Sequence, residues 1–185
     1  MSGEPEGGGG EAALERALHG LRGLYADLDA ELAALAPRCE LSGRCCDFER
    51  SGLTLFATDL ELSHLLRAAP PPPGPAVAAA ADAAGGGEPR LCPWWRGGLC
   101  HAREGRPLGC RVYFCDPSRA AALEEISMRY HARLKRLHDG TGGGGAVPYR
   151  YAPFVARVRA LLAGRAPRAA PAAATSALTA ASGRR

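Results

Sequence analysis

All seven cysteines of this 185-residue chain lie in one window, from Cys39 to Cys115. They form two groups, Cys39, Cys45 and Cys46, followed by Cys92, Cys100, Cys110 and Cys115. Cysteines this dense between cysteine-free flanks are typical of ligands, because intracellular chains use such clusters for metal binding or catalysis. Two other interpretations stay open: a disulfide framework, which an odd number of cysteines disfavours, and buried thiols that pack as small apolar groups.

The N-terminal sequence and the charge pattern bear on compartment and partners. The first ten residues, MSGEPEGGGG, carry acids and glycines where a secretory signal would place basic and apolar residues. No apolar run approaches the roughly 20 residues that a membrane span needs. We therefore expect a cytoplasmic chain with reduced thiols and no membrane partner. The net charge is only +4, and the arginines are scattered among acids, which argues against a nucleic-acid surface.

A heptad-like stripe makes 11–36 the clearest predicted helix. Its apolar residues recur at alternating intervals of four and three: Leu14, Leu18, Leu21, Tyr25, Leu28, Leu32 and Leu35. That spacing places them on one face of a helix, and Pro37 ends the helix just before Cys39. The stripe could pair with a second copy, but packing against later helices of the same chain is the preferred interpretation.

Three further helices follow from capping and breaking signals. Thr58 and Glu61 form a capping-box pattern that opens a helix ending near residue 67. Asp116 followed by Pro117 is an N-cap with proline at the first helical position, and an apolar stripe continues to about residue 138. A last helix is predicted within 149–162, starting near Pro153. Residues 51–57 are short and β-leaning, and 92–115 predict tight turns with a short hairpin.

We expect a mainly α fold, a small helical bundle with a cysteine-rich, metal-held loop region. A disordered leader (1–10) precedes a single domain (11–163), and a disordered tail (164–185) follows it. The domain contains the cysteine core (38–118) and a flexible insert rich in Pro, Ala and Gly (69–89). The N-terminal, 117–138 and C-terminal helices are expected to pack on one another, with the cysteine loops gathered at one end.

A thiolate site also needs compensating charge and exclusion of water. Five arginines stand close to cysteines in the sequence: Arg38, Arg44, Arg96, Arg106 and Arg111. Four aromatic residues, Trp94, Trp95, Tyr113 and Phe114, can cover the site. The spacing does not identify the metal. Only Cys110 and Cys115 fit the two-to-four-residue gap usual in zinc sites, and all-sulfur ligation suits Zn²⁺ and iron–sulfur clusters alike.

The cysteine motifs resemble those of the YkgJ-type cysteine-cluster proteins, described as zinc- or iron-chelating domains. The resemblance rests on CELSGRCC, a T-x-x-E helix start, and CPWWRGGLCHAREGRPLGCRVYFC, and it covers about residues 38–118. The family opens with C-x2-C-x2-CC, which Cys39, Cys45 and Cys46 match, whereas Ser42 stands at the second cysteine. Cys92, Cys100, Cys110 and Cys115 match the later cysteines in order. The resemblance implies a metal-binding module with seven thiols in place of eight.

Histidines could supply a further ligand, and the two adjacent cysteines differ in their expected directions. His101 follows Cys100 directly and is the best candidate for a missing ligand, although an exposed turn histidine is the default interpretation. We expect His64 to be a packing or surface residue. The other histidines, His19, His131 and His138, are expected on the surface. Adjacent Cys45 and Cys46 should point in different directions, so that at most one of them binds a given metal.

The sequence thus predicts a metal-binding cysteine-cluster protein that acts as a small accessory or structural module. Its ligands would be the seven cysteines, and its cofactor Zn²⁺ or an iron–sulfur cluster. The alternative is an iron–sulfur redox or oxidant-sensing protein. We do not expect an enzyme, because the glycine runs lack the Lys-Ser or Lys-Thr of a phosphate loop and no strand–helix alternation is present. A protein partner remains an open question.

Overall fold

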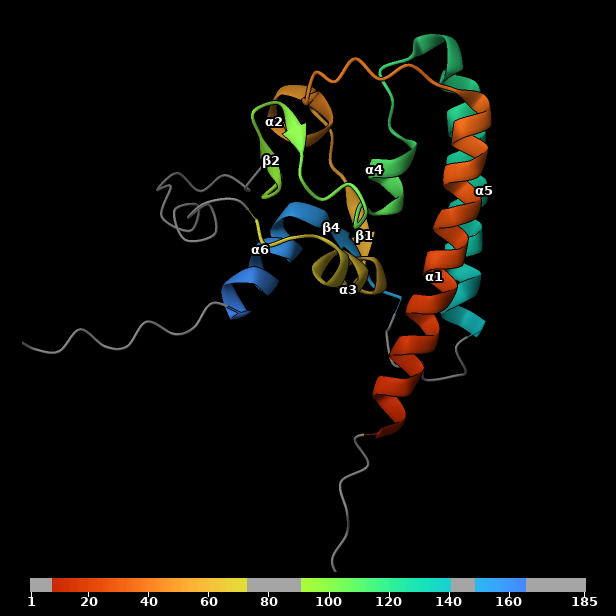
Figure 1. Ribbon diagram of the computed structural model, residues 1–185, viewed down its shortest axis with the longest axis vertical. Coiled ribbons are helices and arrows are strands. Elements are labelled where there is room, and N and C mark those ends of the chain that lie inside the picture. Colours follow the sequence, from red (N-terminus) through yellow and green to blue (C-terminus); the bar gives the residue numbers. More distant parts are fainter. Residues whose placement is uncertain (1–7, 73–90, 141–148, 166–185) are drawn as a thin grey trace, which may run out of the picture.

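The protein is mainly α-helical (Figure 1). A computed structural model describes residues 8–72, 91–140 and 149–165, so most of the predicted leader, insert and tail lie outside the described residues. The helices are α1 (Gly8–Leu35), α2 (Phe48–Ser51), α3 (Asp59–Ala68), α4 (Leu108–Val112), α5 (Ala120–Gly140) and α6 (Phe154–Arg165), with 3-10 turns η1 (Arg44–Cys46) and η2 (Pro117–Arg119). The strands are β1 (Phe56–Thr58), β2 (Trp95–Arg96), β3 (Leu99–Cys100) and β4 (Tyr151–Pro153).

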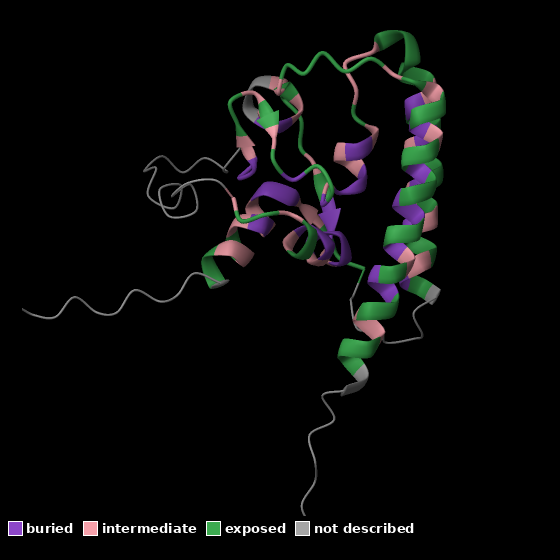
Figure 2. Ribbon diagram, in the orientation of Figure 1, coloured by how far each residue is buried: buried purple, intermediate pink, exposed green. Residues whose placement is uncertain are grey.

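Helices α1 and α5 form an antiparallel pair along one side of the molecule (Figure 1). The predicted stripe of α1 is the buried face, and Leu28 is fully buried against the core that α5 completes with Tyr130 and Leu134. Figure 2 shows the buried residues on the inner faces of both helices and the exposed ones outside. Ion pairs from Arg129 and Arg133 of α5 to acids of α1 line the outer edge. This pair confirms the helix predicted from the heptad spacing.

A second core lies beside this pair and contains α6. Phe154, Val155 and Val158 of α6 pack with Cys46, Trp94 and other residues of the cysteine segments. The prediction that the C-terminal helix packs on the α1–α5 pair is therefore wrong. The reason is a sheet that the sequence did not reveal: β1 and β4 pair antiparallel, with Ala57 opposite Ala152.

The region 92–115 contains the expected hairpin and one helix that was not expected. Strands β2 and β3 are joined by Gly97 and Gly98, both with positive φ, as a two-residue hairpin turn requires. Helix α4 begins after Pro107 and buries Leu108. Five residues are too few to show a helical period, so the sequence suggested only turns there.

The helix caps agree with the sequence prediction. Thr58 and Glu61 make both hydrogen bonds of a capping box at the start of α3. Asp116 accepts a hydrogen bond from the Ser118 N–H at the start of η2. Helix α1 begins at Gly8, inside the predicted leader. Among the described helices, none combines the length and apolar composition that crossing a bilayer requires.

Candidate metal centre

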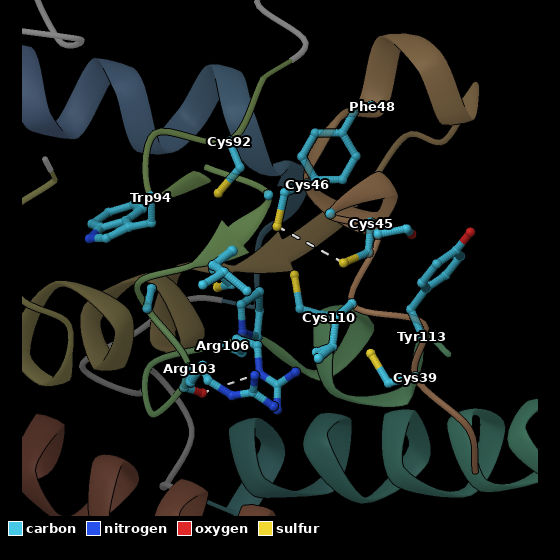
Figure 3. A pocket seen from close by; sticks show the side chains of 18 of the residues that line it. Cys39, Cys45, Cys46, Phe48, Cys92, Trp94, Arg103, Arg106, Cys110 and Tyr113 are labelled. Atoms are coloured by element: carbon cyan, nitrogen blue, oxygen red, sulfur yellow. Dashed lines mark hydrogen bonds between the residues drawn. The ribbon is translucent and has the colours of Figure 1, made fainter. Parts of the chain in front are cut away.

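The two cysteine groups converge on one cavity (Figure 3). The cavity has a volume of about 120 Å³, and all seven cysteines line it. Cys39 comes from the loop after α1, Cys45 and Cys46 from η1, Cys92 from the segment before β2, Cys100 from β3, Cys110 from α4 and Cys115 from the loop after α4. All seven are free thiols, so the disulfide interpretation has no support in this structure.

Backbone contacts hold the two groups together. The Cys92 N–H donates to the Cys46 carbonyl over 3.0 Å, and Asp47 and Leu91 form an isolated antiparallel bridge. Gly43, with φ of 69°, is the N-cap residue of η1. A side-chain carbon at Gly43 would lie 2.7 Å from the carbonyl oxygen of Gly98, so only glycine lets η1 approach the β2–β3 hairpin this closely.

The sulfurs of Cys45 and Cys46 lie 4.0 Å apart. Two sulfurs bound to one zinc ion are about 3.8 Å apart, because metal–sulfur bonds near 2.3 Å form a tetrahedron. The expectation that these adjacent side chains diverge is therefore wrong, since the 3-10 turn directs both into the cavity (Figure 3). The other thiols line the cavity wall. Across the described residues, no group of three or more Cys, His, Asp or Glu side chains has the arrangement of a metal site.

The thiols of the cavity have pKa values that are shifted in opposite directions. Hydrogen bonding to Cys46 lowers the pKa of Cys45 to about 6, and the same interaction lowers the pKa of Cys100 to about 6. Conversely, the neighbouring sulfurs of Cys100, Cys45 and Cys92 raise the pKa of Cys46 well above its ordinary value. Burial raises the pKa of Cys110. The pattern favours a protonated Cys46, whose single S–H can donate to one neighbouring sulfur at a time.

Two arginines and several aromatic rings complete the cavity. Arg103 and Arg106 line it, and their positive charge further favours the Cys100 thiolate. The aromatic cover is made by Trp94, Tyr113 and Phe114, as predicted, together with Phe48 and Phe154, which were not. Phe154 was missed because it reaches the site only through the β1–β4 pairing. Trp94 is held by a hydrogen bond of 2.8 Å from its indole N–H to the Pro70 carbonyl.

The histidines lie outside the cysteine cavity. His101 is exposed and borders a separate cavity of about 250 Å³. His64 is buried as a packing residue, with its Nε2 3.2 Å from the Glu104 carbonyl and its ring against Tyr25. The prediction of a surface position is wrong for His138, which is 8% exposed and packs against the Tyr149 ring. The remaining two, His19 and His131, are exposed and half-buried respectively.

Ser42 also lines the cavity, at its mouth. Its Oγ lies 3.9 Å from the Cys115 sulfur and accepts a 3.5 Å hydrogen bond from the Arg44 N–H. A hydroxyl group therefore stands where the family motif would place a thiol.

A buried carboxylate fixes the helix that carries Cys110. Glu61 is 1% exposed, and one of its oxygens accepts from the Leu108 N–H at 2.8 Å and from the Tyr25 hydroxyl at 3.0 Å. Its other oxygen accepts from the Thr58 N–H at 2.7 Å. Glu61 thus joins α1, α3 and the start of α4. The capping pattern predicted the bond to Thr58 but gave no sign of the other two.

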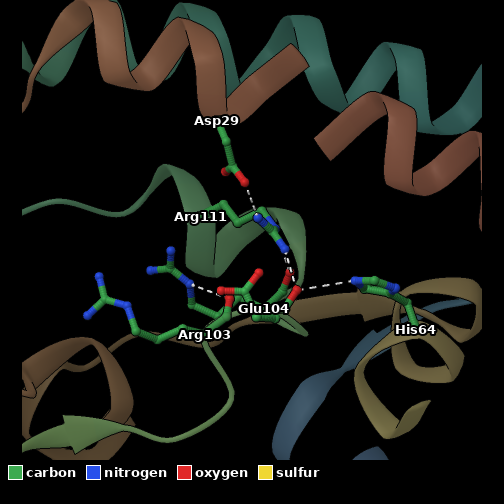
Figure 4. A network of polar contacts seen from close by, with 6 residues as sticks. Asp29, His64, Arg103, Glu104 and Arg111 are labelled. Atoms are coloured by element: carbon green, nitrogen blue, oxygen red, sulfur yellow. Dashed lines mark hydrogen bonds and ion pairs between the residues drawn. The ribbon is translucent and has the colours of Figure 1, made fainter. Parts of the chain in front are cut away.

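Arg111 holds the same helix through a separate set of contacts (Figure 4). Its guanidinium group donates to Asp29 and to the Glu104 carbonyl, both at 2.6 Å, and to the Arg106 carbonyl at 2.8 Å. It also stacks 4.1 Å from the centre of the Tyr25 ring. Arg111 was expected to offset thiolate charge, but its donors are used to hold the loop that presents Arg106 to the cavity.

Replacing Glu61 by glutamine should lower the free energy of unfolding by about 1–3 kcal/mol, because an amide cannot accept from donors on both sides. Urea denaturation followed by circular dichroism measures the change. Glu31→Gln, which alters a surface ion pair with Arg129, is the matched control and should have a much smaller effect. Equal effects of the two substitutions would show that the buried Glu61 carboxylate stabilises the fold no more than a surface ion pair does.

Comparison with models of known protein families, with curated proteins and with solved structures finds no match to this chain. The functional argument therefore depends on the chemistry of the cysteine cavity and on the motif resemblance described above.

Proposed function

We propose that this chain is a metal-binding cysteine-cluster protein that holds Zn²⁺ or an iron–sulfur cluster with the thiolates of residues 39–115. The observation that carries the proposal is the convergence of all seven cysteines, from two groups separated by the 69–89 insert, on one cavity. A cavity lined by seven thiols differs from an ordinary apolar core, in which leucine or valine would fill the space without reactive groups.

The donor set fits a thiophilic metal. Soft thiolate ligands select zinc, copper(I) and iron–sulfur clusters over hard cations. Cys45 and Cys100 have pKa values near 6 and are therefore readily available as thiolates, with Arg103 and Arg106 close by to offset their charge. Rotation about χ1 moves a cysteine sulfur without moving the backbone, so thiols on the wall can close around a central group. When bound, the metal would supply cross-links that stabilise these loops.

The size of the cavity is compatible with an iron–sulfur cluster. A cavity measured with a water-sized sphere needs roughly 10–15 Å³ to hold one water molecule, so the volume of about 120 Å³ exceeds the space that a single ion fills. A cluster of several atoms can bind thiols that lie farther apart around the cavity than a single ion can. We infer that the protein is a small accessory or structural module of the YkgJ type, with an iron–sulfur redox or oxidant-sensing role as the second candidate.

Substituting Cys110 by serine should strongly reduce the metal content of protein purified without oxygen. Cys110 projects from α4 toward Cys45 and Cys46 (Figure 3), so its loss removes a donor from the middle of the cavity. Elemental analysis for zinc and iron, with assay of acid-labile sulfide, measures the result and identifies the metal. Met128→Ser, an exposed change on α5, is the control. Full metal content in the folded Cys110→Ser protein would refute a thiolate centre in this segment.

Chelation should disturb the cysteine region while the α1–α5 pair stays helical. The chain has two tryptophans, and both Trp94 and Trp95 belong to the core around the cavity, so their fluorescence reports that region alone. We expect a strong chelator to shift the tryptophan emission to longer wavelength and to lower the thermal midpoint, with most far-ultraviolet ellipticity retained. An unchanged emission and midpoint after verified metal removal would contradict a stabilising metal.

A further inference from the structure

We infer that the mouth of the cavity carries a second metal site, separate from the inner thiols, formed by Cys39, Cys115 and Ser42. It would take an exchangeable, thiophilic divalent ion such as Zn²⁺. This inference rests on the proposed function, because it assigns different roles to thiols of the same cavity. The inner thiols are Cys45, Cys46, Cys92, Cys100 and Cys110.

The inner thiols form one interacting group. The sulfurs of Cys46 and Cys45 lie 4.0 Å apart, Cys92 and Cys100 act with Cys45 to raise the pKa of Cys46, and Cys110 interacts electrostatically with Cys92 and Cys100. Figure 3 shows the Cys39 sulfur apart from this group, on the side of Tyr113. The inner group thus has enough donors for a complete site without the thiols at the mouth.

The mouth residues are held together by their own contacts. The Arg38 N–H donates to the Asp116 carboxylate over 3.0 Å, which fixes Cys39 and Cys115 on neighbouring segments. That carboxylate is itself anchored, since its other oxygen accepts from the N–H and hydroxyl of Ser118 at 3.1 and 2.6 Å. The Ser42 hydroxyl, 3.9 Å from the Cys115 sulfur, supplies a third donor.

The loop that carries Cys39 and Ser42 has an unusual backbone. Leu41 has φ of 51°, in the left-handed region that disfavours branched and bulky side chains, and Gly43 follows with φ of 69°. These two residues flank Ser42 and turn the chain between Cys39 and Cys45. Backbone strain of this kind is found where a loop must present particular groups to a ligand.

The mouth site is open to solvent. Cys39 and Ser42 are exposed, and Cys115 borders both the cysteine cavity and an adjoining cavity of about 590 Å³. Two thiolates and one hydroxyl leave a coordination position for water or an incoming ligand, which is the arrangement of exchangeable rather than structural zinc. Arg38 and Arg44 line the adjoining cavity together with the acidic residues Glu40 and Asp116, so its charged lining is balanced.

The test is the rate at which zinc leaves the full-length protein for a chromogenic chelator, after loading with Zn²⁺ and gel filtration. We expect a fast phase of about one equivalent from the mouth and a slow phase from the inner thiols. Cys39→Ser and Cys115→Ser should each abolish the fast phase only. In Ser42→Cys, the zinc that left in the fast phase should leave in the slow phase instead. Met128→Cys, which adds an exposed thiol on α5, should change neither phase.

The outcomes separate the two proposals. A single slow phase, or an equal loss of both phases in Cys39→Ser, overturns the separate mouth site and leaves the metal-binding proposal standing. Failure to retain any metal overturns both. If the inner centre is an iron–sulfur cluster, its visible absorption replaces the slow phase as the readout, and Cys39→Ser should leave that absorption intact.

Discussion

The buried carboxylate of Glu61 is the junction on which the rest of the structure depends. Removing a carboxylate from water is costly, and it is offset here by hydrogen bonds from Thr58, Tyr25 and Leu108. These donors belong to the cap of α3, to α1 and to α4, so one side chain connects the α1–α5 pair with the second core. Burial and the nearby Glu61 charge raise the pKa of Tyr25, which therefore stays a hydrogen-bond donor across the physiological range.

The two cores differ in composition. The α1–α5 pair buries a long leucine stripe and contributes no cysteine, whereas the second core contains Cys46, Cys92 and Cys100 among its members. Helix α4 links them, because Leu108 packs in the first core while Cys110 faces the cavity. A metal bound by the thiols would thus add cross-links to the segments of the second core, beside a helical pair that is stabilised by burial of its leucine stripe.

Local signals predicted the parts of the fold that local interactions determine. The α1 stripe, the Thr58–Glu61 cap and the Gly97–Gly98 hairpin all depend on residues close in sequence. The sequence did not reveal α4, the β1–β4 pairing or the packing of α6. A five-residue helix has no period, and pairing between strands about 95 residues apart depends on tertiary contacts. For the site, it predicted the cysteines and most of the aromatic cover. It misplaced Arg111, which pairs with Asp29 of α1, and His138, which packs against Tyr149, because both contacts depend on the tertiary structure.

X-ray absorption at the zinc and iron edges, on protein purified without oxygen, tests most directly whether these thiols hold a metal. We expect a metal at near-stoichiometric content with a first shell made largely of sulfur at about 2.3 Å. Cys110→Ser should lower the metal content. A first shell of only oxygen and nitrogen, or a folded protein that contains no metal and binds none when reloaded under reducing conditions, would contradict the proposal that this cavity is a thiolate metal centre.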